Sequence, residues 1–284
     1  LIAGMPGSGK TFFMVNTAAN EIAMGRRVIA IDPKDDFIKL KNIMPSVEVI
    51  DLNNVRPGSL NPFTFIEDCN AITLMTVIEI LLGGVTREDR SALIPILTDF
   101  MNSYRQTGTY TDLQDLIDYL HANRNDVARQ IGQNLRLNES SKYSQLLFTR
   151  ARSVEPLYIP MDRSVVISLL GMTIPDASKN EEKYTAEERF SSAILYILCS
   201  KLREILSAAS QTRIPSTIYI DEAHSLFAND QMSTIISEIL RLGRSLKTAT
   251  VLGSQAVNSF PEDIAQYISS KFLFKSSMDN ASAF

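Results

Sequence analysis

The sequence predicts an α/β fold in which a mainly parallel β-sheet is flanked by helices and interrupted by an all-α insertion. Short apolar runs rich in β-branched residues alternate with longer segments of helical periodicity, as expected for buried parallel strands. The chain opens on the tail of a strand, a glycine-rich turn and the start of a helix. The alternation then stops for about a hundred residues before it resumes, which predicts one sheet split by a helical segment.

The individual elements follow from these patterns. Strands are expected at residues 27–31, 47–51, 164–170, 216–220, 248–252 and 271–275. Helices of the same α/β pattern are expected at residues 10–24, 186–210 and 232–245, and a further helix should begin near residue 276. The first helix should end at Gly25, because glycine readily adopts the left-handed conformation that closes helices.

The predicted domain organisation follows from the interruption. Between residues 69 and 155 the strand signal is absent and apolar residues recur at a spacing near 3.6, as in amphipathic helices. We therefore expect residues 1–68 and 156–284 to form the α/β core and residues 69–155 to form an all-α insertion subdomain. The core is expected to be truncated at both ends, because only a stub of strand precedes the glycine-rich turn.

Composition limits the class of protein. The 284 residues are 45% hydrophobic and 21% charged, as is usual for a globular protein, and carry a formal net charge of −4. This charge argues against a uniformly basic nucleic-acid binder. No apolar run is long enough to span a membrane. The two cysteines and two histidines are isolated, which indicates neither a disulfide framework nor a zinc site and suggests a reducing, cytoplasmic location.

The first chemical motif is a complete G-x-x-x-x-G-K-[ST] phosphate-binding loop between a strand and a helix. Its backbone N–H groups and the following helix N-terminus form an anion site. Lys10 can reach the β- and γ-phosphates, and the Thr11 hydroxyl can bind Mg²⁺. The sequence shows no N-K-x-D segment for reading guanine, which favours ATP. The predicted nucleotide-binding residues are Gly4, Met5, Pro6, Gly7, Ser8, Gly9, Lys10, Thr11 and Phe12.

The second motif is an apolar strand that ends in Asp221-Glu222. We expect this strand to neighbour the first strand of the sheet, so that Asp221 lies near the phosphate loop and binds Mg²⁺. Glu222 would then polarise the water that attacks the γ-phosphate. His224 completes the letters of a helicase box, but no other helicase motif is visible, and we expect it to have a local structural role.

The third motif combines a strand end with a helix end. Gln255 follows the strand at 248–252, where polar residues line the ligand crevice of α/β folds, and could respond to hydrolysis. Arg241 and Arg244 end the preceding helix. Either one, with Arg244 favoured, could enter the site of a neighbouring subunit as an arginine finger. The alternative for both is a favourable interaction with the helix C-terminus.

These motifs together resemble a known family. The matching segments are residues 4–11, 31–37, 60–63, 218–223, 242–245 and 253–255. They are similar to the ATPase motor domains of type IV secretion and conjugation systems, the CagE/TrbE/VirB family, within the FtsK/HerA group of RecA-like P-loop ATPases. One departure is Ser245, where relatives often carry lysine after the arginine, which weakens the assignment of Arg244. The resemblance implies a homo-oligomer, commonly a hexamer, at the inner face of the cell membrane, with secretion-channel components as partners.

The sequence thus favours a Mg²⁺-dependent ATPase motor that energises type IV secretion or conjugative transfer, with DNA or a protein as the transported substrate. A coupling-protein or HerA/FtsK-like DNA translocase would share the same active site. A protein of another class, an assembly scaffold that binds ATP without hydrolysing it, is the third hypothesis. The pairing of Glu222 with Gln255 argues against a scaffold, because a passive binder needs no water-activating carboxylate.

Overall fold

The computed structural model describes most of the chain. The described residues are 1–137, 142–149, 153–175, 179, 181–209, 214–228, 230–243, 245–255, 260, 264 and 266–275. The helix expected from residue 276 and the arginine at position 244 lie outside these residues.

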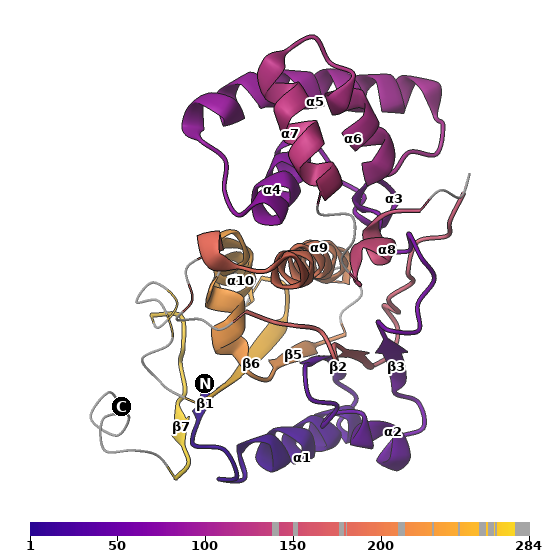
Figure 1. Ribbon diagram of the computed structural model, residues 1–284. Helices are drawn as coiled ribbons and strands as arrows, with labels where there is room; N and C mark the ends of the chain where they lie inside the picture. The colour runs from indigo at the N-terminus through magenta and orange to yellow at the C-terminus, as the bar shows by residue number, and fades with distance from the viewer. Residues whose placement is uncertain are drawn as a thin grey trace.

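A seven-stranded sheet forms the centre of the described part of the chain (Figure 1). Its strands lie in the order β3-β4-β2-β5-β6-β1-β7, and every neighbouring pair is parallel. The strands are β1 (Ile2–Ala3), β2 (Arg27–Asp32), β3 (Glu48–Asp51), β4 (Val165–Ser168), β5 (Ser216–Ile220), β6 (Thr248–Ser254) and β7 (Phe272–Leu273). The predicted α/β fold with a parallel sheet is confirmed, and each predicted strand is present, although β4 and β7 are shorter than expected.

The expected neighbour of the first strand was wrong. The strand that precedes Asp221, β5, pairs with β2 and β6 and not with β1. Strand β6 lies between β5 and β1, because its residues Gly253 and Ser254 pair with Ile2 and Ala3. Strand pairing depends on contacts distant in the chain, which no local pattern specifies.

Helices cover both faces of the sheet (Figure 1). One face carries α1 (Lys10–Ala23) and α2 (Lys39–Ile43), and the other carries α9 (Ala186–Ala209) and α10 (Asp230–Leu242). Alternate residues of β2 serve the two faces: Val28 and Ala30 belong to a small core with Met14 of α1, whereas Ile29 and Ile31 belong to the larger core. All six residues of β2 are buried, as expected for a strand that helices cover on both sides.

The described residues between 69 and 155 form helices and no strand, as predicted. They contain α4 (Ala71–Leu82), α5 (Arg87–Thr107), α6 (Leu113–His121), α7 (Asp126–Leu137) and α8 (Ser144–Leu147), and the short α3 (Pro62–Phe65) precedes them. Helix α4 lies against α9, and α5, α6 and α7 lie beyond it (Figure 1). Apolar side chains of these helices join the same core cluster as α9. The helical segment is therefore an insertion in the order of the chain, but it shares one hydrophobic core with the helices of the sheet. The boundaries of the insertion subdomain remain a prediction.

Among the described residues, none of the helices combines the length and apolar character that crossing a membrane requires. This includes α9, the longest of them at 24 residues.

Asn61 connects the sheet to the insertion. Its side chain is fully buried, its Oδ1 accepts a hydrogen bond from the backbone N–H of Phe63 at 3.2 Å, and its Nδ2 donates one to the carbonyl of Thr111 at 2.7 Å. The first bond caps α3 and the second reaches the loop before α6. The asparagine thus fixes the point at which the chain leaves the sheet and enters the helices.

Replacing Asn61 with alanine should therefore destabilise the protein. The variant loses a helix cap and leaves the buried Thr111 carbonyl without this partner, so the free energy of unfolding should fall by about 2–4 kcal/mol. Denaturant unfolding of the wild type and the variant measures this. Asn125→Ala is the control, because Asn125 caps α7 on the surface and its loss should cost about 1 kcal/mol. Equal losses in the two variants would contradict the role of Asn61.

Candidate functional site

The phosphate loop has the geometry that its glycines allow. It joins β1 to α1, and Gly7 and Gly9 adopt φ values of 75° and 93°, in the left-handed region. A Cβ atom on Gly4 would lie 2.7 Å from both Phe274 Cβ and Ser8 Oγ, so a side chain cannot be accommodated there. The loop thus returns the chain tightly to the start of α1, where the first backbone N–H groups of the helix can bind an anion.

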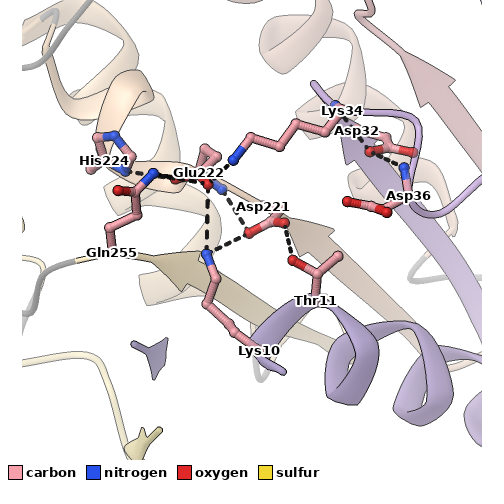
Figure 2. Close-up of polar contacts among 9 residues, drawn as sticks. All are labelled: Lys10, Thr11, Asp32, Lys34, Asp36, Asp221, Glu222, His224 and Gln255. Atoms are coloured by element: carbon pink, nitrogen blue, oxygen red, sulfur yellow. Dashed lines mark hydrogen bonds and ion pairs between the residues drawn. The ribbon is translucent and has the colours of Figure 1, made fainter. Parts of the chain in front are cut away.

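Four side chains meet beside this loop, from two segments distant in the sequence (Figure 2). Lys10 Nζ donates a hydrogen bond to Asp221 Oδ1 at 2.9 Å and lies 3.8 Å from Glu222 Oε1. The Thr11 hydroxyl donates to Asp221 Oδ2, also at 2.9 Å. Lys10 is 6% exposed and Asp221 only 2%, so this contact is made largely away from water.

Asp221 is buried but remains ionised. Burial by itself would raise the pKa of its carboxyl group, because it disfavours the charged form. The charge and hydrogen bond of Lys10, the Thr11 hydroxyl and the Glu222 backbone N–H outweigh burial and hold the pKa below its ordinary value. An ionised carboxylate next to the Thr11 hydroxyl is a suitable pair of oxygen ligands for Mg²⁺.

The Glu222 carboxylate is surrounded by nitrogen atoms of side chains from several elements. Lys34 Nζ donates a hydrogen bond to Oε1, and Gln255 Nε2 lies 3.3 Å from both carboxylate oxygens. His224 Nδ1 lies 3.4 Å from Oε2. Glu222 has a φ of 51°, in the left-handed region that residues other than glycine rarely adopt. This backbone conformation allows the consecutive carboxylates of Asp221 and Glu222 to lie on the same side of the chain, next to Lys10.

Lys34 was not among the site residues that the sequence predicted. Its pKa is affected first by burial, which lowers it, but the hydrogen bond and charge of Glu222 raise it above its ordinary value overall. Lys34 follows β2, and β2 pairs directly with β5, so both strands deliver their last residues to the same edge of the sheet. Only this pairing could have identified the lysine as part of the site.

Asp32 organises the turn that follows β2. Asp32 is fully buried and accepts hydrogen bonds from the backbone N–H groups of Lys34, Asp36 and Phe37, at 3.3, 3.1 and 2.7 Å. Burial raises the pKa of its carboxyl group, against the effect of these N–H groups. Asp32 is thus the residue that forms the turn carrying Lys34.

Gly253 allows Asp221 to reach the phosphate loop across an intervening strand. Since β6 separates β5 from β1, any side chain at position 253 would stand between Asp221 and α1. A Cβ atom there would lie 2.5 Å from Asp221 Oδ1 and 2.8 Å from Met14 Sδ. The sequence analysis included Gly253 in the family resemblance without a role, because the need for glycine arises from the strand order.

A cleft of about 380 Å³ opens between these elements, which is a volume typical of small-ligand sites. It is lined by every predicted nucleotide-binding residue together with Lys34, Asp36, Glu222 and Gln255. Ser8 Oγ is buried and has no hydrogen-bond partner among the described residues, and it lies in the phosphate loop itself. The cleft therefore fits a polyphosphate with a divalent cation: loop N–H groups and Lys10 suit the phosphates, and Thr11 and Asp221 suit the metal.

Of the two arginines predicted as candidate arginine fingers, the structure describes Arg241. Arg241 is exposed in the last turn of α10 and does not line the cleft. The chain turns from α10 directly into β6, whose seven residues span about 20 Å before they reach Gln255. Arg241 therefore lies at the opposite edge of the sheet from the cleft of its own chain. Arg244 lies outside the described residues.

Fold and site together define a P-loop nucleotide-binding protein of the parallel α/β class. The chain matches the AAA-like domain family over residues 1–283, and it belongs to that family. The family match and the parallel sheet agree with the P-loop α/β fold that the resemblance implied.

Two known proteins illustrate the relationship. The structure resembles that of VirB4 of Thermoanaerobacter pseudethanolicus with a TM-score of 0.72, at 18% sequence identity, over 99% of this chain and 78% of that one. The sequence is 23% identical over 278 residues to "Uncharacterized protein YddE" of Bacillus subtilis (strain 168), covering 90% of this chain and 33% of that protein. The chain thus spans about a third of the length of this curated relative.

Replacing Gly253 with alanine tests the packing of the site. The added methyl group would overlap Asp221 and Met14, so the free energy of unfolding should fall by about 1–3 kcal/mol. The rise in melting temperature produced by Mg²⁺ and ATP should also shrink, because Asp221 is displaced from Thr11. Thermal unfolding with and without Mg²⁺ and ATP measures both effects. Ala249→Val is the control, as Ala249 is exposed on the same strand and should tolerate added volume. Wild-type behaviour of Gly253→Ala would contradict this account.

Proposed function

We propose that this chain is an ATP-hydrolysing motor domain of the type that energises type IV secretion or conjugative transfer. The single observation that carries the proposal is the contact of Lys10 and Thr11 with Asp221, beside a second carboxylate, Glu222, at the edge of the phosphate-loop cleft. A protein that only held a nucleotide would need the loop but not the second carboxylate. The likeness to VirB4 supports the secretion context, since this fold covers nearly the whole chain.

In the proposed reaction, each group has a defined role. Loop N–H groups and Lys10 bind the phosphates, and Mg²⁺ held by Thr11 and Asp221 would neutralise their charge. Glu222 accepts a proton from a water molecule as its oxygen attacks the γ-phosphorus. The bond from that phosphorus to the β–γ bridging oxygen breaks, which yields ADP and inorganic phosphate. Gln255, which contacts Glu222, orients this carboxylate and responds to the loss of the γ-phosphate.

We further propose that the working form is a homo-oligomer, a hexamer in the longer protein, at the inner face of the cell membrane. Its partners would be components of a secretion channel, and DNA or a protein would be its cargo. The position of Arg241 supports this part of the proposal: it is exposed at the sheet edge opposite its own cleft, so any cleft that it serves belongs to another copy.

Substitution of the central residues tests hydrolysis. Lys10→Ala should lose both nucleotide binding and turnover. Glu222→Gln should keep binding but reduce turnover by about 10²–10⁴-fold, because it removes the general base without changing shape. Phosphate release and equilibrium binding, measured at concentrations where the chain self-associates, report the two properties. Glu67→Gln, on the exposed surface before α4, is the control and should leave both unchanged. Binding of ATP without turnover in the wild type would favour the scaffold hypothesis instead.

A mixing experiment tests the role of Arg241 in another subunit's site. Arg241→Ala should lower turnover, by up to about 10³-fold if it is the finger. An equimolar mixture of Arg241→Ala with Lys10→Ala should regain activity, because one variant supplies an intact nucleotide site and the other an intact arginine. Turnover is measured for each variant alone and for the mixture. A mixture no more active than its components would exclude Arg241 as the finger and leave Arg244. DNA-stimulated, salt-sensitive turnover in the same assay would point to a DNA translocase.

A further inference from the structure

Lys34 lies between the Glu222 carboxylate and the phosphate-loop cleft. Its Nζ forms an ion pair with Glu222 Oε1, yet its side chain is 52% exposed and lines the cleft beside the phosphate loop. Glu222, by contrast, is 11% exposed and has little freedom. The lysine head can therefore leave the carboxylate and turn into the cleft, whereas the carboxylate cannot follow it.

The backbone below Lys34 is held in place. Its own N–H donates to Asp32 Oδ1, and two further N–H groups of the same turn donate to the buried Asp32 carboxylate. Asp35, with a φ of 59°, receives a hydrogen bond from the Ser168 hydroxyl of β4. Only the flexible four-carbon stem of the lysine is free to move its charge. The structure thus combines an anchored Cα atom with a mobile ammonium group.

The ion pair has a consequence for catalysis. An oxygen of Glu222 that already accepts a hydrogen bond from an ammonium group is a poorer acceptor for a proton of water. A γ-phosphate in the cleft would offer Lys34 several anionic oxygens in place of one. Lysine is a compact cation that suits such an exchange of partners.

We propose that Lys34 is a γ-phosphate sensor shared between Glu222 and the nucleotide. When a triphosphate occupies the cleft, Lys34 moves from Glu222 to the γ-phosphate, which removes the ammonium group from Glu222 Oε1 and makes this oxygen a better acceptor for a proton from water. With a diphosphate, Lys34 stays on Glu222. Lys34 is thus a positioning residue that makes the general base available only when there is a bond to hydrolyse. This inference rests on the proposed function, because it requires that the cleft binds ATP.

Equilibrium binding of ATP and ADP tests the sensor without relying on turnover. The measurement is made in the Glu222→Gln background, where hydrolysis is blocked, by calorimetry with Mg²⁺ present. Adding Lys34→Met should weaken ATP binding by about ten- to a hundredfold, as expected for one hydrogen bond between charged groups. ADP binding should change by less than about twofold. Lys34→Arg, which keeps the charge, should retain most of the preference for ATP.

Lys39→Met is the matched control. Lys39 lies five positions after Lys34, pairs with Asp36 at 2.6 Å, and does not line the cleft. Its loss changes the net charge of the protein by the same amount as the loss of Lys34. If the effect of Lys34 were only long-range electrostatics, the two variants would weaken ATP binding alike. We expect the Lys39 variant to bind both nucleotides as its parent does.

The competition itself gives a second readout. Glu222→Gln alone replaces the carboxylate by a neutral amide and releases Lys34, so affinity for a non-hydrolysable ATP analogue should rise relative to that for ADP. This rise should be absent when Lys34 is methionine. Equal losses of ATP and ADP affinity in the Lys34→Met variant, or no loss at all, would overturn the inference while leaving the proposed function intact. A wild-type protein that bound neither nucleotide would overturn the proposed function itself.

Discussion

The contact between Lys10 and Asp221 is the interaction on which the rest of the site depends. It joins the first helix to the end of β5, 211 residues later in the chain. Placing two consecutive carboxylates in a nearly water-free position costs several kcal/mol per ion unless cations and N–H groups surround them. Lys10 supplies the first cation and the Thr11 hydroxyl a further bond. The strand order, the glycine at position 253 and the tight loop at the start of the chain are all arranged so that this contact can form.

The same requirement explains why the site draws on several strands. One lysine cannot neutralise two carboxylates, and the second cation, Lys34, comes from the turn after β2. Gln255, after β6, donates toward Glu222 from the other side. In a parallel sheet all these strand ends meet at one edge, which is why ligand sites of such folds lie there. The negative charge of the two carboxylates is therefore balanced by residues that are distant in the sequence but lie at the same edge of the sheet.

The elements of the sheet could largely be predicted, because each strand and helix is encoded by a contiguous pattern. The runs at 27–31 and 216–220 are fully buried strands, as their β-branched composition indicated. The phosphate loop could be predicted for the same reason, since its signature is a fixed spacing of glycine, lysine and threonine within eight consecutive residues. Lys34 was missed because nothing in its neighbourhood distinguishes a lysine on the surface from one that faces a carboxylate. The strand beside β1 was misassigned for a similar reason: the pattern of a strand does not name its neighbour.

The sequence by itself determined which chemical groups are available and on which element each one stands, because motif, periodicity and turn chemistry act over a few residues. Only the tertiary structure decided which of these groups meet. Strand β6 enters between β1 and β5, and this makes glycine necessary at position 253, since the Asp221 carboxylate must cross the intervening strand to reach Lys10. The pairing of β2 with β5 brings Lys34 to Glu222. The pairing of β1 with β6 and the contact of Lys34 with Glu222 join residues 188 or more positions apart, which local physical chemistry cannot specify.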